Sequence, residues 1–229
     1  MSTILITGAN RGIGLELTRR YAAASHSLIA CCRTPSEALR ALAKEKPKVR
    51  ICPVEVGKAD SVAALAKSIG DLPIDILINN AGTQGPSPQE QSLEQMDYEG
   101  WAETFAVNTM APLRMLQVFL PNLKAAAHPK VVTITSQMGA LSLDMTMMYA
   151  YCASKAAVNK VMRLASVELA REGIAVGLIH PGWVRTDMGG AGAALSVEES
   201  VDGILKVIDS LDLENSGFFR KWNGETHSW

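Results

Sequence analysis

The chain has 229 residues, of which 48% are hydrophobic and 20% charged, and its formal net charge is −1. This composition is typical of a folded globular domain, and it offers no electrostatic basis for binding nucleic acid or an anionic membrane. No apolar run reaches the ~20 residues that a spanning helix needs. Because the first predicted strand begins at about Thr3, we expect no signal or transit peptide, and therefore a soluble cytoplasmic protein.

Short apolar runs alternate along the chain with segments of helical pattern. The runs predict strands at residues 4–6, 28–30, 49–51, 74–78, 131–134 and 174–179, with a weaker seventh at 217–219. Helical patterns cover residues 13–23, 61–69, 151–171 and 197–208. Such alternation predicts parallel strands joined by right-handed crossovers, with helices on both faces. We therefore expect an α/β fold, a doubly wound (Rossmann) parallel sheet of about seven strands, as a single domain over residues 1–229.

The first predicted strand leads into a loop that contains Gly8, Gly12 and Gly14 and then opens a helix. A loop without side chains lets a pyrophosphate approach the backbone and rest at the positive end of the helix dipole. The spacing is GxxxGxG rather than the more general GxGxxG. Three glycines alone are a weak signal, but their place after the first strand indicates a dinucleotide site.

Two arginines flank the expected position of the adenosine ribose: Arg11 inside the glycine loop, and Arg33 after the second predicted strand. Residues 27–34 contain no Asp or Glu that would bind a ribose 2′-hydroxyl. Guanidinium groups suit a 2′-phosphate instead, so the sequence favours NADP over NAD. The alternative interpretation is that both are solvated surface arginines.

The strand expected at 74–78 ends in Asn79, Asn80, Ala81 and Gly82. Amide side chains can tie adjacent loops by hydrogen bonds, and two small residues leave room for a flat ligand. Taken alone, the motif could be only a turn. Two flexible segments, residues 83–88 and 189–192, follow predicted strands at the edge where such sheets bind ligands, and we interpret them as the rim and lid of a pocket.

A candidate catalytic group follows the strand expected at 131–134. Tyr151 and Lys155 are four residues apart, which places phenol and ammonium on one helix face, and Ser136 lies at the strand end. A phenol has a pKa near 10, and a neighbouring cation, joined by a positively charged nicotinamide, favours its ionised form. The tuned phenol can exchange a proton with a carbonyl oxygen that Ser136 also binds. A surface helix with an amphipathic Tyr and a solvated Lys is the alternative.

Asn108 carries a further indication. If residues 101–120 are helical, Pro112 lacks the N–H that would bond the Asn108 carbonyl. That carbonyl is then free to hold a water linking Lys155 to solvent, although a simple helix kink is the alternative. Tyr149, six residues before Lys155, lies off its face and is assigned to the pocket wall or a subunit contact.

Together these residues resemble the short-chain dehydrogenase/reductase family over essentially the whole chain. The matching residues, in order, are Thr7, Gly8, Gly12, Gly14, Asn79, Asn80, Ala81, Gly82, Asn108, Ser136, Tyr151, Lys155, Pro181 and Gly182. The resemblance implies that Ser136 and Tyr151 bind the substrate oxygen, that Lys155 also holds the nicotinamide ribose, and that Asn108 anchors a water relay. The predicted cofactor contacts are Gly8, Asn10, Arg11, Gly12, Ile13, Gly14, Arg33, Glu55, Val56, Asn80, Ala81, Gly82, Tyr151, Lys155, Pro181, Gly182, Val184 and Thr186.

Two departures from the family pattern limit the transfer. Glu55 stands where the family often has an Asp near the adenine, and its side chain is longer by one methylene. The stretch between Thr186 and Val197 is short, so we expect an open pocket and broad specificity. The closing residues, from Asn223 to Trp229, are also similar to small carbonyl reductases of the sniffer and C-factor type.

The surroundings of Ser136 and Tyr151 are rich in apolar side chains. Met138, Met145, Met147 and Met148 crowd the segment between them, and Trp183 and Met188 follow later. Thioethers can line an adaptable apolar pocket, but methionine at such positions equally fits a core or a subunit interface. The cysteines and histidines have no metal-ligand spacing, so no metal site is predicted.

The sequence therefore predicts an NADPH-dependent oxidoreductase that reduces an aldehyde or ketone to an alcohol, with Tyr151 as general acid. The alternatives are an NADP-binding regulatory or signalling protein with little turnover, or a 3-oxoacyl reductase or alcohol dehydrogenase of the same family. The expected partner is a small carbonyl or alcohol substrate, with neither nucleic acid nor membrane. By resemblance, we also expect a homodimer or homotetramer that uses the helices at 101–120 and 151–171.

Overall fold

The computed structural model describes residues 1–144 and 146–229; Met145 of the predicted methionine-rich segment lies outside the described residues. Within these residues, one sheet has the strand order β3-β2-β1-β4-β5-β6-β7, and every pair of neighbours is parallel. The strands are β1 (Thr3–Thr7), β2 (Ser27–Cys32), β3 (Val49–Pro53), β4 (Ile76–Asn79), β5 (Lys130–Ile134), β6 (Ala175–His180) and β7 (Phe218–Lys221). The predicted doubly wound α/β fold is confirmed.

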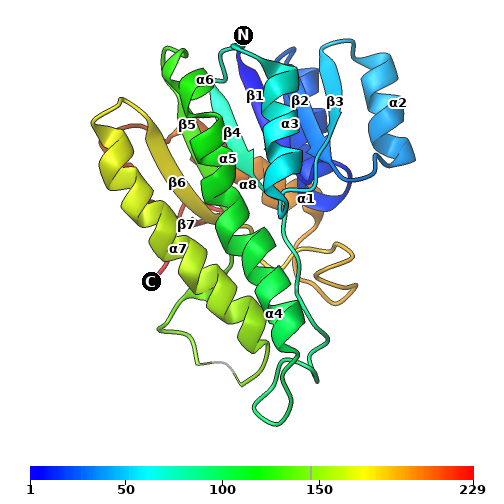
Figure 1. Cartoon of the computed structure of the whole chain (residues 1–229), viewed down its shortest axis with the longest axis vertical. Helices are drawn as coiled ribbons and strands as arrows, with labels where there is room; N and C mark the ends of the chain where they lie inside the picture. The colour runs from blue at the N-terminus through cyan, green and yellow to red at the C-terminus, as the bar shows by residue number, and fades with distance from the viewer. Residues whose placement is uncertain (145) are drawn as a thin grey trace.

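Helices cover both faces of the sheet, with α3, α5 and α7 in front and α1 and α8 behind (Figure 1). Their bounds are α1 (Gly12–Ala23), α2 (Glu37–Glu45), α3 (Ala59–Ile69), α4 (Tyr98–Phe105), α5 (Ala111–Val118), α6 (Leu120–Lys124), α7 (Tyr149–Ala170) and α8 (Val197–Asp209). Among the described residues, no helix combines the length and apolar character needed to cross a membrane.

The core is divided into two layers by the sheet. Leu5 and Val131 point to the layer under α3, α5 and α7, while Ile4 and Val132 point to the layer over α1 and α8. Because both faces of each central strand are buried, the strands are continuous apolar runs rather than alternating ones. This is why the central strands could be recognised from short hydrophobic runs. The weaker seventh candidate, at residues 217–219, is confirmed as the start of β7.

The direction in which successive strands are added to the sheet reverses between β1 and β4. The connection after β1 leads to β2 on one side, and the connection after β4 leads to β5 on the other. Such a switch point opens a crevice at the carboxyl ends of the two strands, which is where open α/β sheets bind their ligands. The loops that follow β1, β4, β5 and β6 all emerge at this edge (Figure 1).

The helix expected over residues 101–120 is interrupted, which corrects the prediction. α4 ends at Phe105, a π-helical turn covers Ala106–Met110, and α5 begins at Ala111. The Ala111 N–H bonds the carbonyl of Ala106, five residues earlier. Because Pro112 has no N–H to continue the four-residue ladder, the helix widens here instead of bending sharply.

Two other elements differ from the sequence prediction. α2 was not predicted, although Ser36 caps it by accepting the N–H of Leu39 at 3.2 Å. α7 begins at Tyr149 rather than at Tyr151. Only one residue of α2 is fully buried, so its apolar pattern is too short to stand out.

Candidate active site

The carboxyl ends of β1 and β4 are tied together by hydrogen bonds. Thr7 Oγ1 accepts the N–H groups of Asn80 and Ala81, each at 3.0 Å. In return, Asn80 Nδ2 donates to the carbonyls of Thr7 at 2.9 Å and Gly8 at 3.2 Å. The expectation that an amide ties adjacent loops is therefore met at Asn80, and the floor of the crevice is rigid.

Two glycines are required by this close approach of backbones. Gly8 has φ +67°, and a Cβ there would lie 2.9 Å from the Ala81 Cα. A Cβ on Gly14 would overlap the Gly8 carbonyl. Both positions thus exclude side chains because protein atoms already occupy the space. This requirement holds whether or not a pyrophosphate is bound.

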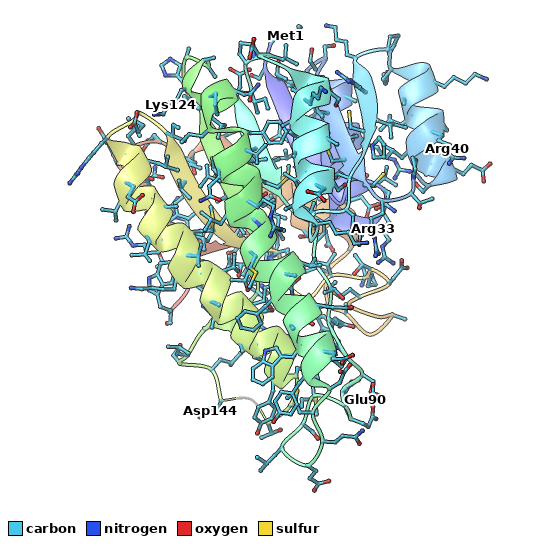
Figure 2. All side chains as sticks on the ribbon, viewed as in Figure 1. Met1, Arg33, Arg40, Glu90, Lys124 and Asp144 are labelled. Atoms are coloured by element: carbon cyan, nitrogen blue, oxygen red, sulfur yellow. The ribbon has the colours of Figure 1, made fainter. Side chains whose placement is uncertain are left out.

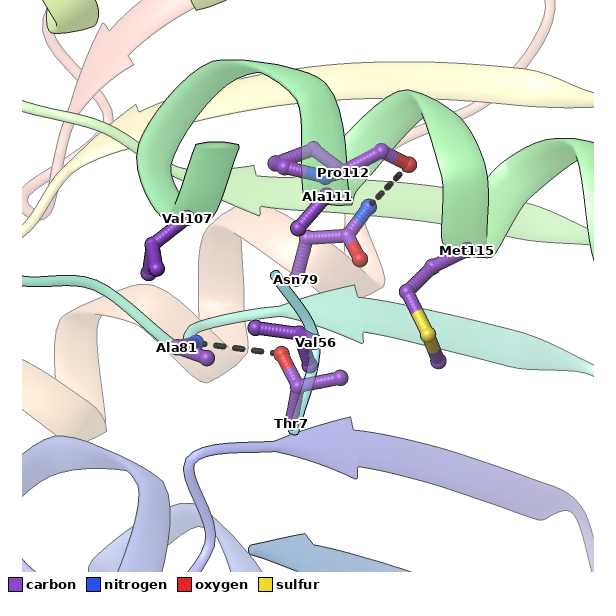
Figure 3. A pocket seen from close by; sticks show the side chains of 8 residues that line it. All are labelled: Thr7, Val56, Asn79, Ala81, Val107, Ala111, Pro112 and Met115. Atoms are coloured by element: carbon purple, nitrogen blue, oxygen red, sulfur yellow. Dashed lines mark hydrogen bonds between the residues drawn. The ribbon is translucent and has the colours of Figure 1, made fainter. Parts of the chain in front are cut away.

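Asn79 acts on the other side of the strand. Its Nδ2 donates to the Pro112 carbonyl at 3.4 Å, which ties β4 to α5 (Figure 3). A small cavity lies at this junction, and Val56 and Met115 are among the residues that line it. The two amides of the motif therefore bind different segments: Asn79 binds α5, and Asn80 binds the start of the glycine loop.

The adenosine side of the crevice carries the two predicted arginines. Asn10 Nδ2 donates to the Thr34 carbonyl at 3.3 Å, so the glycine loop is held against the loop after β2. Arg33 is exposed on that second loop (Figure 2). Arg11 is exposed too, but its NH1 forms an ion pair with Asp187 Oδ2 at 2.7 Å. Arg11 is therefore paired across the crevice rather than simply solvated.

The predicted adenine contacts lie after β3. Glu55 Oε2 pairs with Lys58 Nζ at 3.0 Å, so its carboxylate has a neighbour on its own loop. The carbonyls of Val56 and Gly57 accept from Arg114 NH1 at 3.1 and 3.2 Å. This segment is thus fixed against α5.

Ser136, Tyr151 and Lys155 are brought together in the interior. Ser136 follows β5 and caps a 3₁₀ turn, while Tyr151 and Lys155 lie on the buried face of α7. Lys155 Nζ donates to the Ile134 carbonyl at 3.2 Å and stands 5.8 Å from the centre of the Tyr151 ring. The Ser136 hydroxyl is close enough to the Tyr151 phenol to lower its pKa. The predicted constellation is therefore assembled.

Burial dominates the pKa values of Tyr151 and Lys155 in the protein alone. It raises the pKa of the phenol, and Ser136 opposes this only in part. Burial also lowers the pKa of Lys155 to about 8. The protein's own groups thus favour the protonated phenol, and the lower phenol pKa expected from the sequence includes the charge of a bound nicotinamide.

Asn108 lies within the π-helical turn and is 1% exposed. Its Nδ2 donates to the Thr83 carbonyl at 2.8 Å and to Ser154 Oγ at 3.0 Å, and its Oδ1 accepts the Thr83 N–H at 2.9 Å. Asn108 Oδ1 and Lys155 Nζ both approach Gly82, since a Cβ there would lie 3.3 and 3.7 Å from them. The side chain of Asn108, rather than its carbonyl, thus bridges Thr83 in the loop after β4 and Ser154 on α7.

The segment after β6 covers the crevice and is here called the strap, residues 183–192. Its predicted residues are placed at the crevice: the Thr186 methyl faces Gly12, and Val184 pairs with Leu195. The strap is held from both walls, by Arg11 through Asp187 and by Gln84 Nε2, which donates to the Met188 carbonyl at 2.9 Å. Both contacts lie just before residues 189–192, whose role as part of a lid stays a prediction.

The anchoring of the strap begins at its root. The Ser200 hydroxyl donates to the Pro181 carbonyl at 2.6 Å. Gly182 has φ +85°, and a Cβ there would overlap the Leu195 side chain. Gly182 is therefore required for the turn that leads into the strap.

Sequence reasoning missed four residues that organise the site: Ser154, Gln84, Gln91 and Asp187. Each acts through a contact to a segment far away in the sequence. Spacing within one element gave no signal for any of them. Within the described residues, no group of three potential metal ligands comes together.

A parallel seven-stranded sheet with a glycine loop after β1 and a buried Ser, Tyr and Lys at the carboxyl edge defines a class of nucleotide-dependent oxidoreductase folds. The model of the family described as short chain dehydrogenase matches residues 2–194. The chain belongs to this family.

Similar proteins agree with this assignment. The C-signal protein of Myxococcus xanthus is 42% identical over 167 residues, which cover 72% of this chain and 99% of the relative. An NADPH-bound carbonyl reductase from chicken fatty liver has a TM-score of 0.92 and 35% identity, covering 100% of this chain and 99% of that one. The carbonyl reductase Sniffer of D. melanogaster has a TM-score of 0.92 and 30% identity over the whole of both chains. The resemblance drawn from the sequence is confirmed.

Proposed function

We propose that the protein is an NADPH-dependent reductase of a small, largely apolar aldehyde or ketone. The observation that carries the proposal is the convergence of Ser136, Tyr151 and Lys155, each less than a tenth exposed, with the Lys155 ammonium facing Gly82. A hydroxyl, a phenol and an ammonium buried together at the carboxyl edge form a site for polarising and protonating a carbonyl oxygen.

The crevice fits a phosphorylated dinucleotide. The glycine loop opens α1, so its N–H groups face a pyrophosphate, and Gly82 leaves space beside Lys155. Arg33 and Arg11 supply positive charge on the adenosine side, where NADP differs from NAD by a 2′-phosphate. The chicken enzyme of similar structure is NADPH-bound, which supports the same cofactor here.

NADPH, when bound, supplies the hydride. Ser136 donates a hydrogen bond to the substrate oxygen and orients it beside Tyr151. The Tyr151 phenol then transfers its proton to that oxygen as the alcohol forms, and the resulting phenolate is stabilised by the Lys155 ammonium. Lys155 and Asn108 converge at Gly82, and we assign them to the path that returns a proton to the phenolate.

The entrance to the site favours an apolar substrate. Four exposed apolar side chains lie on the loops that follow β5 and β6: Leu141, Met147, Trp183 and Met188. Leu141 and Met147 lie in the segment that follows Ser136, and Trp183 and Met188 lie in the strap. Flexible thioethers and an indole in such a rim accept apolar groups of varied shape.

The experiment is to measure NADPH oxidation by the purified protein against a panel of aldehydes and ketones, with NADH in parallel. Tyr151→Phe removes only the phenol oxygen and is expected to abolish turnover while leaving NADPH binding intact. Tyr149→Phe is the matched control, because Tyr149 lies on an exposed part of the same helix. Unchanged turnover of Tyr151→Phe would reject the assigned role.

A second candidate function is a cofactor-binding signalling protein with little turnover. The similarity to a relative named C-signal is the observation that favours it. Tight NADPH binding together with no turnover on any carbonyl or alcohol tested would support this second function against the first.

We also propose that the protein assembles as a homodimer or homotetramer. Apolar side chains are exposed on neighbouring helices, with Tyr98 on α4 and Leu164 and Val167 on α7 all more than half exposed. α4 packs against α7, and Leu164 and Val167, three residues apart, share one exposed face of α7. Light scattering after size exclusion measures the mass, and Leu164→Asp is expected to produce the monomer.

A further inference from the structure

Gln91 is a fully buried polar residue in the long loop between β4 and α4, and the mechanism above does not use it. Its exposure is 0%, although its neighbours in the loop are largely exposed. Its Nε2 donates to the carbonyls of Gln84 at 2.9 Å and Pro86 at 2.5 Å. Its Oε1 accepts the N–H of Tyr151 at 3.1 Å, and its own carbonyl accepts the N–H of Tyr149 at 3.3 Å.

The helix that receives these bonds has no cap of its own. Met148, at the N-cap position of α7, has φ +63° and makes no side-chain capping bond. The first N–H groups of a helix have no partner within the helix, and a buried one left unpaired is costly. Gln91 therefore caps α7 from a distance of 60 residues along the chain.

Both ends of the Gln91 amide are used, which fixes its orientation. Its two N–H donors are taken by loop carbonyls, so the oxygen must face the helix. A carboxylate could accept from Tyr151 but could not donate to Gln84 and Pro86. It would also bring a negative charge into the interior near the phenol, whereas the amide caps the helix without a charge.

The capped turn is the one that carries the reacting phenol. The same loop also contains Thr83, which binds Asn108, and Gln84, which holds the strap through Met188. A shift of this loop is therefore transmitted to the start of α7 by way of Gln91.

We propose that Gln91 is a positioning residue for carbonyl reduction: its amide caps the first turn of α7 and thereby holds the Tyr151 phenol in line with Ser136. This inference rests on the proposed function. Gln91 touches no reacting atom, and it acts on the reaction through the backbone of Tyr151.

The test uses two variants and a control. Gln91→Met keeps the volume and removes the amide, and Gln91→Glu keeps the acceptor but adds a charge. Gln89→Met is the matched control, because Gln89 is exposed on the same loop and its bond to Ser92 uses only the main-chain carbonyl. The measurements are kcat, the Kd of NADPH, the pH profile of kcat and hydrogen exchange at the Tyr151 amide.

For Gln91→Met, we expect kcat to fall by at least about tenfold, in line with the loss of one cap and of the phenol's alignment. The Kd of NADPH should stay within about twofold, because the glycine loop is not touched, and the Tyr151 amide should exchange faster. Gln91→Glu should regain activity relative to wild type as the pH falls, because a protonated carboxyl again has a donor and an acceptor. The comparison is made at pH values where circular dichroism shows Gln91→Glu to be fully folded, so that the recovery reports the position of Tyr151 and not the folded fraction.

Several results would overturn the inference. These are a kcat of Gln91→Met within about twofold of wild type, unchanged exchange at the Tyr151 amide, or an activity ratio of Gln91→Glu to wild type that does not vary with pH. If Gln91→Met does not fold, the pH dependence of Gln91→Glu decides the question. Absence of carbonyl turnover in the wild type would instead refute the proposed function, and amide exchange would still test the cap.

Discussion

The Lys155 ammonium stands 5.8 Å from the centre of the Tyr151 ring, one turn along the same buried face of α7. Both groups have lost most of their water, and the loss moves their pKa values in opposite directions: that of the phenol upward and that of the ammonium down to about 8. A phenol with a raised pKa remains protonated throughout the neutral range. In the protein alone, the pair therefore holds its phenol proton at neutral pH.

The burial of Lys155 has a cost in stability. Its pKa is about 8 in the folded chain against 10.5 for the free side chain, so folding disfavours the charged form. This cost is fully present below pH 8 and disappears as the pH rises from 8 to 10.5. The free energy of unfolding of Lys155→Met is expected to be roughly 1–3 kcal/mol higher than that of wild type at pH 7, so the variant is more stable although its reductase activity is lost.

Urea unfolding at pH 7 and at pH 10 measures this difference, which should shrink at the higher pH. Lys160→Met is the control, because Lys160 is exposed on the same helix and should change stability little at either pH. A Lys155→Met protein less stable than wild type at pH 7 would contradict the argument.

A second titrating group is His180, at the end of β6 and 7% exposed. Burial, with His227 and Lys221 nearby, lowers the pKa of His180 to about 4. Because the unfolded chain binds this proton near pH 6.5, stability falls as the pH drops from 6.5 to 4, by about 2–3 kcal/mol. His180→Phe should flatten this part of the stability curve, as measured by urea unfolding at pH 7, 5.5 and 4. An equally steep decline in the variant would point to other groups.

The two cofactor arginines are expected to contribute unequally. Arg11 is already neutralised by Asp187, whereas Arg33 has no ion pair within the described part of the chain. Arg33→Ala should therefore weaken NADPH binding by about tenfold, and Arg11→Ala by only about two- to fivefold, with NADH binding little changed in either. Calorimetric titration with each cofactor measures both effects. Equal losses for NADPH and NADH would show that neither guanidinium reads the 2′-phosphate.

Most of the framework could be predicted from the sequence because it rests on local patterns. The strands are buried on both faces and so read as short apolar runs, and the Tyr151 to Lys155 spacing is a property of one helix. The glycine loop is recognisable because φ values such as that of Gly8 exclude other residues.

What escaped prediction depends on contacts between distant segments or on competing energies. The π-helical turn at Asn108 needs both Pro112 and the docking of Asn108 against Thr83 and Ser154. The direction of the Tyr151 pKa depends on how much water the fold removes, and no spacing in the sequence contains this quantity.

Two buried threonines, Thr7 and Thr133, allow the same substitution to be compared at two positions. Thr7 Oγ1 accepts two N–H groups from the loop after β4, at Asn80 and Ala81. Thr133 on β5 is as deeply buried, but its Oγ1 has no hydrogen-bond partner in the part of the chain that the structure describes. Valine has nearly the shape of threonine and lacks the oxygen, so the same substitution has opposite consequences at the two positions.

Thr7→Val leaves two partly buried N–H groups unpaired and should lower the free energy of unfolding by about 1–3 kcal/mol. It should also weaken NADPH binding, because Asn80 and the glycine loop lose their common anchor. Thr133→Val removes a hydroxyl that is already unpaired and should be neutral or stabilising. Urea unfolding of both variants at one pH decides the matter: a loss at Thr133 equal to that at Thr7 would mean that burial of the side chain, rather than its bonds to the loop, stabilises this edge of the sheet.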